Sequence, residues 1–326
     1  MTDEPIDQPL RPQPRSKPGV ARRRPASFGR RLAGSDVFIR ASAPILRAIV
    51  PLAIALGPAR TEKAVLRLFL SLAPFLRHNR IAAANIALAF PEKSEAEHKR
   101  ILRGAWENFA KAVTEFVFID SLVAALSAPP DKSPIRLFGT DLFALRDDGK
   151  PAVIFSAHLA NWELLAVLAE KWGLKMVLPY RRARNVQIAE DMQARRRATM
   201  GRLVSSHRGS ALEIAAALDR GEHLGVLIDQ RLNSGIAVPF FGRTALTNPL
   251  PAKLARRFDC PVHGARAVRF PNGELHLELT PALDLPRDAE GLIDVAGATA
   301  RMTEVVEGWV REHPEQWFWF HDRWRT

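Results

Sequence analysis

The chain has 326 residues, of which 47% are apolar, so it is long enough for one or two domains and a large core. This composition excludes an intrinsically disordered protein and a polytopic membrane protein. The 47 Lys and Arg residues against 35 Asp and Glu leave a formal net charge of +12, which favours an acidic partner: nucleic acid, an anionic membrane or an acidic carrier protein. The single cysteine, Cys260, excludes an internal disulfide and a multi-cysteine metal site.

The amino-terminal 60 residues predict a tail and a membrane-seeking helix. Residues 1–36 are rich in Pro and Arg and predict a disordered basic tail. Residues 37–60 follow, and their apolar part reaches the roughly 20 residues that cross a bilayer. Arg40 and Arg47 interrupt this stretch, which favours an interfacial helix over a single short anchor. Its basic flank favours a cytoplasmic amino terminus and attraction to anionic lipid, whereas a buried amphipathic helix is the alternative.

We predict a single domain over residues 61–326, and its first part, residues 61–127, is expected to be helical. Apolar residues recur at helical spacing from 61 to 90, and Pro74 predicts a break. Ser94 and Glu97 have the spacing of a capping box that opens a long helix. A Pro-rich stretch over 127–134 predicts the connection to the next part.

Residues 134–326 alternate between short apolar strands and helices, which indicates an α/β fold: a helical amino-terminal region followed by a mixed sheet covered by helices. The turn signal PNG before an alternating run predicts a hairpin between 260–270 and 274–280. The other strands are expected at 152–157, 175–180, 224–229 and 236–240, and helices near 185–200, 210–220, 248–258 and 292–312.

The run HLANWE, 158–163, lies where the strand over 152–157 turns into an amphipathic helix. A neutral imidazole with a pKa near the usual value of about 6.5 can accept a proton from an alcohol, provided that a carboxylate fixes its tautomer. Five positions within one helix would set His158 and Glu163 about 140° apart, but a histidine in the preceding turn can fold back over the helix. The pattern therefore predicts His158 as a general base oriented by Glu163.

The same turn offers further groups for catalysis. Asn161 is the expected N-cap, and the free backbone N–H groups of the helix could bind an oxyanion or a phosphate. The chain has no G-x-S-x-G nucleophile elbow, so direct attack by a substrate hydroxyl is expected. No metal ligand set and no cofactor motif is found, and neither is expected.

Polar residues at other strand ends are further candidates. Arg181, with Arg182 and Arg184, follows a strand end, where ligands bind in open α/β sheets; a solvated basic loop is the alternative. Asp229 closes a strand and could bind a substrate hydroxyl or pair with an arginine. The last tryptophans, Trp309, Trp317, Trp319 and Trp324, are consistent with an interfacial aromatic segment or with a terminal helix docked on the core.

HLANWE resembles the His-x4-Asp/Glu motif of glycerolipid-type acyltransferases. Further segments resemble the late acyltransferases of bacterial lipid A biosynthesis, namely RIAAANIALAFPEKSEAEHKRIL, PYRRARN, LDRGEHLGVLIDQR and HPEQWFWFHDRWR. The resemblance runs from about residue 37 to 326. It implies a glycerolipid-acyltransferase-like fold and transfer of an acyl chain from acyl carrier protein to a hydroxyl of a lipid A precursor, at the cytoplasmic face of the inner membrane.

Roles follow from this resemblance residue by residue. His158 corresponds to the family's general base and Glu163 to its orienting carboxylate. An arginine about thirty residues downstream is linked to the active site, and here it is Arg195 or, in the alternative register, Arg196. Arg181, Asp229 and Gln230 lie in motifs that imply substrate binding or site architecture.

The alternatives concern the donor and the class of protein. An acyl-CoA-dependent glycolipid or phospholipid acyltransferase keeps the chemistry and changes the substrates. A simple lysophosphatidic-acid acceptor is disfavoured, because such enzymes carry Asp where this chain has Glu163 and a phosphate loop that this chain lacks. An alternative from a different functional class is a non-catalytic basic protein that binds membranes. Nucleic-acid binding is not expected, since no RNA-binding motif or zinc finger is present.

Overall fold

The computed structural model describes residues 48–125, 133–140, 142–181, 186–207 and 209–324. The chain divides into two units, Met1–Ser42 and Ala43–Thr326, and all described residues belong to the second. The predicted tail over 1–36 and the first part of the predicted helix over 37–60 therefore lie outside the described residues. The boundaries of the predicted tail, helix and domain stay predictions.

The helical part follows the expected pattern. Its elements are a helix over residues 48–56, α3 (Pro58–Leu72), a 3-10 turn (Ala73–Phe75), α4 (Arg77–Ala89), α5 (Glu95–Val117) and α6 (Ile119–Ala125). The break at Pro74 is confirmed. The capping box is also confirmed, because the Ser94 hydroxyl accepts from the Glu97 N–H and the Glu97 carboxylate accepts from the Ser94 N–H. Of the helices in the described ranges, none is both long and apolar enough to cross a membrane.

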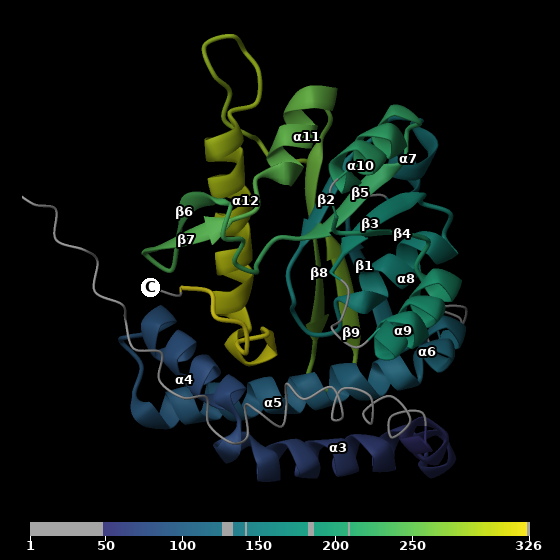
Figure 1. Ribbon diagram of the computed structural model, residues 1–326, viewed down its shortest axis with the longest axis vertical. Coiled ribbons are helices and arrows are strands. Elements are labelled where there is room, and N and C mark those ends of the chain that lie inside the picture. Colours follow the sequence, from purple (N-terminus) through teal and green to yellow (C-terminus); the bar gives the residue numbers. More distant parts are fainter. Residues whose placement is uncertain (1–47, 126–132, 141, 182–185, 208, 325–326) are drawn as a thin grey trace, which may run out of the picture. The chain divides into compact units, whose positions relative to one another are not determined.

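The second part is a seven-stranded sheet in the order β1-β9-β8-β2-β5-β3-β4, mixed because β8 and β9 are antiparallel and the other pairs are parallel (Figure 1). The strands are β1 (Ile135–Gly139), β2 (Val153–Ser156), β3 (Met176–Tyr180), β4 (Arg202–Ser205), β5 (His223–Leu227), β8 (Val262–Arg269) and β9 (Leu275–Leu279). The α/β fold class and the hairpin are confirmed. The predicted strand β6 (Ile236–Phe240) pairs instead with β7 (Arg243–Thr247) in a separate two-stranded sheet.

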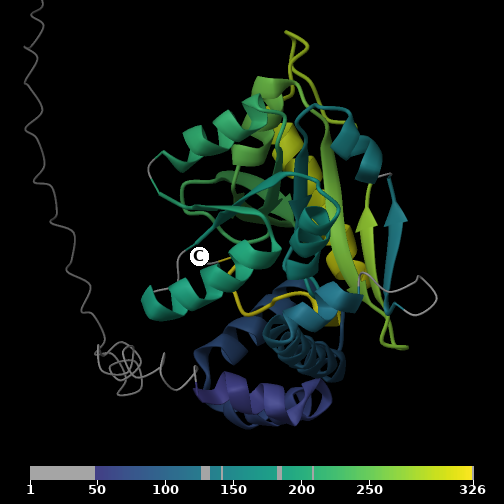
Figure 2. The ribbon, with the colours of Figure 1, turned by 90° about the vertical axis from the view of Figure 1, so that its right-hand side faces the viewer.

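Helices cover both faces of the sheet (Figure 2). One face packs on α10 (Ser210–Asp219), α11 (Leu250–Phe258) and α12 (Val295–Glu312), where Phe155 of β2 stacks on Trp309 of α12. The other face packs on α7 (Leu142–Asp147) and α8 (Glu163–Lys171), where Ile154 meets Ala169. Because β2 is central and covered on both sides, all four of its residues are buried, which explains its unbroken apolar run.

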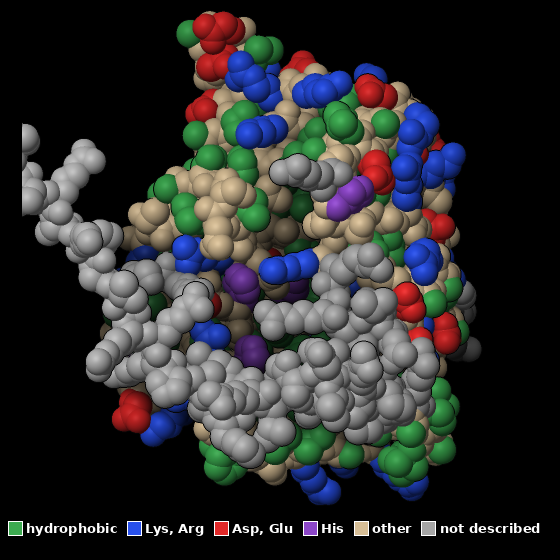
Figure 3. Space-filling model, in the orientation of Figure 1, with side chains coloured by type: hydrophobic (Ala, Val, Ile, Leu, Met, Phe, Trp, Pro, Cys, Tyr) green, Lys and Arg blue, Asp and Glu red, His purple; other side chains and the backbone are tan. Residues whose placement is uncertain are grey.

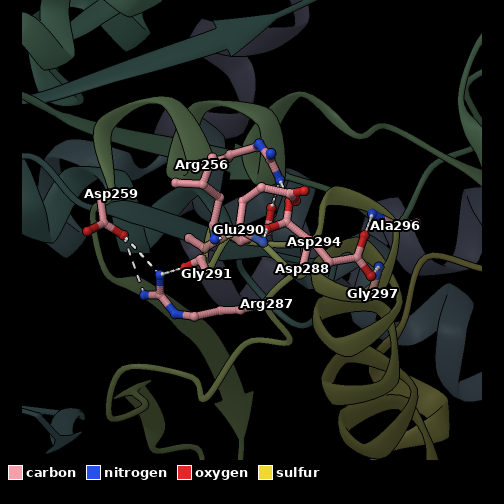
Figure 4. Close-up of polar contacts among 11 residues, drawn as sticks. Arg256, Asp259, Arg287, Asp288, Glu290, Gly291, Asp294, Ala296 and Gly297 are labelled. Carbon is pink, nitrogen blue, oxygen red and sulfur yellow. Dashed lines mark hydrogen bonds and ion pairs between the residues drawn. The ribbon is translucent and has the colours of Figure 1, made fainter.

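The connection before α12 is fastened to α11 by polar contacts (Figure 4). Arg256 of α11 donates to the Asp288 carboxylate and to the Ile293 carbonyl oxygen. Asp294 caps α12 by accepting from the Ala296 and Gly297 N–H groups. These contacts fix the entry of α12 and hence the segment that follows it.

The segment after α12 returns across the helical part. It begins with a 3-10 turn, Pro314–Gln316, and runs to Trp324. Asn85 of α4 donates to the carbonyl oxygens of Trp319 and His321 at 2.8 and 2.6 Å, and Asn108 of α5 donates to Gln316 at 2.9 Å. Residues 313–324, called here the C-terminal segment, therefore join the helical part to the carboxyl end of the sheet's central strands (Figures 1 and 2).

The tryptophans of this region are core residues. Trp309, Trp317, Trp319 and Trp324 are each less than 9% exposed. Docking on the core is confirmed, although only Trp309 lies in a helix, α12. The interpretation of these rings as a membrane interface is wrong, because Trp309 packs on Phe155 and the other three pack on Phe240 or Phe241. Arg323 is buried with them, and burial lowers the pKa of its guanidinium to about 10.

Candidate active site

His158 lies just beyond the carboxyl end of β2, in the loop that leads to α8. This loop is held by the C-terminal segment through backbone hydrogen bonds. Ala160 N–H donates to the Gln316 carbonyl at 3.0 Å, Phe318 N–H donates to the His158 carbonyl at 3.0 Å, and Leu159 forms a β-bridge with Trp317. Ala160 has φ 44°, a left-handed conformation that is unfavourable for a residue with a Cβ. The fold therefore maintains local backbone strain next to the histidine.

Asp229 orients the His158 ring. Its Oδ1 lies 2.8 Å from His158 Nδ1, while its Oδ2 accepts from the His158 backbone N–H at 2.8 Å and from Trp317 Nε1 at 2.7 Å. An ionised carboxylate only accepts, so Nδ1 carries the proton and the Nε2 lone pair points away from Asp229. Gln230 Nε2 lies 3.2 Å from His158 Nε2 and donates to that lone pair. The ring is thus held as the tautomer that a general base requires.

The pKa of Asp229 shows how strongly the fold favours its charged form. Burial opposes ionisation of this fully buried carboxyl group, but the charge of His158, its two N–H donors and the Trp317 indole outweigh burial. Together they lower the pKa of Asp229 from 3.8 to about 2. At neutral pH the site therefore holds a buried carboxylate whose oxygens are occupied.

The predicted contact between Glu163 and the His158 ring is wrong, because Asp229 takes that position in the structure. Glu163 instead forms an ion pair with Arg196 of α9 (Val186–Thr199), whose Nε donates to Glu163 Oε2 at 3.1 Å. The reason is the register of the sheet: Ser156 of β2 is paired with Leu227 of the parallel strand β5. Two residues beyond each of these, His158 and Asp229 leave the same edge side by side.

The start of α8 also differs from expectation. The helix begins at Glu163 with Trp162 as its N-cap residue, and the expected cap, Asn161, uses its side-chain amide to donate to Glu115 of α5 at 2.8 Å. Glu115 also pairs with Arg269 of β8. Asn161 therefore fastens the loop to the helical part and does not cap α8.

The residues predicted to bind substrate divide into two groups. Arg181, Arg196 and Gln230 line the cavity beside His158. Arg195 turns away and donates to the Val117 carbonyl oxygen at 3.1 Å, so the alternative register, Arg196, faces the site. Arg182 and Arg184 lie outside the described residues.

An elongated cavity of about 610 Å³ opens beside His158. Figure 3 shows a hollow on this face with histidine, lysine and arginine side chains around it. His158, Glu163, Arg196 and Gln230 form a polar part of its wall, and most of the remaining lining residues, from the sheet and α8, are apolar. The lining also includes side chains of the buried cluster around Ile154, namely Ala169, Leu174, Met176 and Ala265. The volume is that of a ligand pocket.

The fold and the site together define an α/β protein in which a histidine–aspartate pair lies beside a cavity with a mostly apolar lining. The chain matches the model of the bacterial lipid A biosynthesis acyltransferase family over residues 40–326 and belongs to that family. A comparison with curated proteins finds no match. The resemblance seen in the sequence is confirmed: the protein is an acyltransferase of lipid A biosynthesis, and its family implies a lipid A precursor as acceptor.

Asp229 should make the stability of the protein depend on pH in the acid range. Because folding lowers the pKa of Asp229 from 3.8 to about 2, its contribution to stability is complete above about pH 5 and is lost as the pH falls through the lowered pKa. We expect the difference in unfolding free energy between wild type and Asp229→Asn to shrink over that window by on the order of 2 kcal/mol. Urea denaturation at a series of pH values measures it, and two parallel curves would contradict the assignment.

Proposed function

We propose that the protein transfers a fatty acyl chain from acyl carrier protein to a hydroxyl group of a lipid A precursor, with His158 as general base. The observation that carries this proposal is the position of His158 on the wall of a cavity whose lining is mostly apolar. A base for an alcohol and a channel for a hydrocarbon tail are the two parts that esterification by a fatty thioester requires.

The proposed step is direct transfer. The acceptor oxygen attacks the thioester carbonyl carbon while His158 Nε2 takes the hydroxyl proton. The tetrahedral intermediate collapses with cleavage of the carbon–sulfur bond, and the imidazolium returns the proton to the departing thiolate. Asp229 stabilises the imidazolium formed in between, as the carboxylate of a catalytic triad does.

The carbonyl oxygen gains negative charge during this step, and two groups can oppose it. No side chain caps the amino terminus of α8, where the Leu164 N–H donates to the Asn161 carbonyl oxygen at 3.3 Å; we assign the oxyanion to the other N–H groups of this first turn. Arg196 lies at the same end of the cavity and is held there by Glu163. We therefore propose that Glu163 positions Arg196, whereas Asp229 orients His158.

The basic character of the chain supports both proposed partners. Arg181 is exposed at the carboxyl end of β3 and lines the mouth of the cavity, where an acidic carrier protein or a lipid phosphate would approach. An acyl-CoA donor is the alternative, because its phosphates carry the same charge. Measuring turnover with matched carrier-protein and CoA thioesters separates the two.

Attachment to an anionic membrane surface is proposed from an exposed apolar ridge on the helical part. Leu68, Leu72 and Phe75 recur at helical spacing along α3 and its 3-10 extension, and they are 55%, 46% and 84% exposed. Exposed basic residues accompany them, namely Lys63, Arg67, Arg77 and Arg80. Figure 3 shows hydrophobic and basic side chains together along the lower edge of that view. Apolar side chains with a basic rim suit the headgroup region of the bilayer.

Variants of the three site residues test the mechanism. We expect His158→Ala to abolish acyl transfer and Asp229→Asn to lower kcat about a thousandfold or more, because asparagine permits the wrong ring tautomer. Glu163→Gln should lower turnover by releasing Arg196, yet leave the His158 tautomer unchanged in nitrogen NMR. The assay is mass spectrometry with an acyl carrier thioester and a lipid A precursor. Wild-type turnover by His158→Ala would refute the mechanism.

The cavity makes a separate prediction about chain length. Ala169 lines the cavity within the buried cluster around Ile154, so we expect Ala169→Leu to narrow the space there and to exclude the terminal carbons of a long acyl chain. We expect the ratio of kcat/KM for long against short donors to fall at least tenfold, while the short donor is used nearly as before. The short donor is the internal control, and an unchanged ratio would place the acyl chain elsewhere.

Membrane attachment is tested at the tip of the ridge. Phe75→Asp should weaken binding to phosphatidylglycerol-containing vesicles about tenfold or more, because it removes an apolar anchor and adds a repelled charge. Leu212→Asp is the matched control, since Leu212 is 72% exposed on α10, away from the ridge. Sedimentation with vesicles measures both, and equal binding by the two variants would exclude the ridge as the attachment site.

A further inference from the structure

Trp317 supplies a hydrogen bond that the proposed reaction does not use directly. Its indole Nε1 donates to Asp229 Oδ2 at 2.7 Å, opposite the oxygen that binds the His158 ring. Trp317 is 3% exposed and belongs to the C-terminal segment, far from His158 in the sequence. Both its backbone and its ring are fixed by neighbours.

The backbone of Trp317 bridges to Leu159, the residue after the histidine. Its indole lies edge-on to Trp319 at 4.5 Å and to Phe240 at 5.7 Å between ring centroids. An indole held on two sides cannot turn its N–H away without disturbing these contacts. The donor is therefore preorganised towards Asp229 before any substrate binds.

We propose that Trp317 is a positioning residue for acyl transfer, which acts through Asp229 to set the orientation and basicity of His158. This inference rests on the proposed function of His158 as the base. The Asp229 Oδ2 atom accepts from two donors, Trp317 Nε1 and the His158 backbone N–H, and these fix the plane of the carboxylate. With that plane fixed, Oδ1 is directed at His158 Nδ1.

Removing the indole donor has two consequences. The buried Oδ2 atom loses a partner that water cannot readily replace, so the carboxylate becomes freer to rotate and holds the ring less well. Its negative charge is also less dispersed, so it attracts the imidazolium form more strongly. Turnover should fall, and the protonation of the base should move to higher pH.

Other titratable or charged groups near His158 and Asp229 come from the C-terminal segment, the cavity wall and the loop after β5. His321 and Arg323 of the C-terminal segment interact electrostatically with Asp229, and Glu163 and Arg196 line the cavity beside His158. Arg231, in the loop after β5, donates its backbone N–H to His321 Nε2 at 3.0 Å. All of these groups remain when Trp317 is replaced, so a shift in pH dependence reports the loss of the indole donor.

The test compares Trp317→Phe with Trp319→Phe. Both remove a buried indole of the same segment, but Trp319 Nε1 donates to the Pro314 carbonyl oxygen and not to Asp229. For Trp317→Phe we expect kcat to fall about tenfold to a hundredfold with little change in KM, and the acid limb of the kcat profile to move to higher pH. For Trp319→Phe we expect the acid limb of the kcat profile to stay at the wild-type pH, even if the variant lowers the unfolding free energy.

A double-mutant cycle identifies the route of the effect. If Trp317 acts through Asp229, adding Trp317→Phe to Asp229→Asn should cost less than threefold more in kcat. The pH midpoint of the His158 ring signals in NMR should rise in Trp317→Phe, a readout that needs no substrate. The NMR midpoint can be measured even if the wild-type protein shows no acyl transfer. Absence of acyl transfer would contradict the proposed function but would not by itself contradict the effect of Trp317 on His158.

An unmoved acid limb and NMR midpoint in Trp317→Phe, or the same shifts in Trp319→Phe, would overturn the positioning role. So would full additivity of Trp317→Phe and Asp229→Asn. Trp317→Met serves as the second variant if phenylalanine unfolds the protein, because its flexible apolar side chain can refill the site and brings no hydrogen-bond donor. The same three readouts apply to it.

Discussion

The contact between His158 and Asp229 depends on the parallel pairing of β2 with β5. Adjacent parallel strands end at one edge of a sheet, so residues that are equally far beyond a paired position emerge together. Here the pairing of Ser156 with Leu227 brings an imidazole and a carboxylate into hydrogen-bonding distance. The pair is thus set by two neighbouring strands in the middle of the sheet, which are buried along almost their whole length.

The sheet alone does not complete the site. The loop that carries His158 contains a left-handed alanine, Ala160, whose backbone N–H is bound by Gln316 of the C-terminal segment. That segment is in turn held by Asn85 and Asn108 from two helices of the helical part. The helical part, the sheet and the C-terminal segment therefore converge on one loop, which explains why family resemblance extends over nearly the whole chain and not over the HLANWE run alone.

Sequence reasoning worked where a local signal was strong. The apolar run before His158 predicted β2, the spacing of Ser94 and Glu97 predicted a helix start, and PNG predicted the hairpin. It failed at the edges: β1 and β4 are short edge strands with exposed or half-buried residues, so they lack the apolar pattern of a central strand.

The partner of His158 could not be read from local spacing, because it depends on strand order. Glu163 is close to the histidine in sequence, but α8 directs its side chain to Arg196, whereas Asp229 arrives through β5. A usable signal was present: Asp229 ends a second buried strand, and parallel strands in an α/β sheet share a ligand-binding edge. Similarly, the tryptophans were consistent with two environments until packing against Phe240 and Phe241 distinguished them.

The dependence of the catalytic loop on the C-terminal segment has a consequence for biosynthesis. Every strand of the sheet is translated before Trp317, so a ribosome-bound chain can assemble the hydrophobic layers while the bridge to Leu159 is still missing. In such an unfinished chain the loop that carries His158 lacks its backbone hydrogen bonds to Gln316 and Phe318. The loop therefore gains its full set of contacts only when the last dozen residues of the chain have docked.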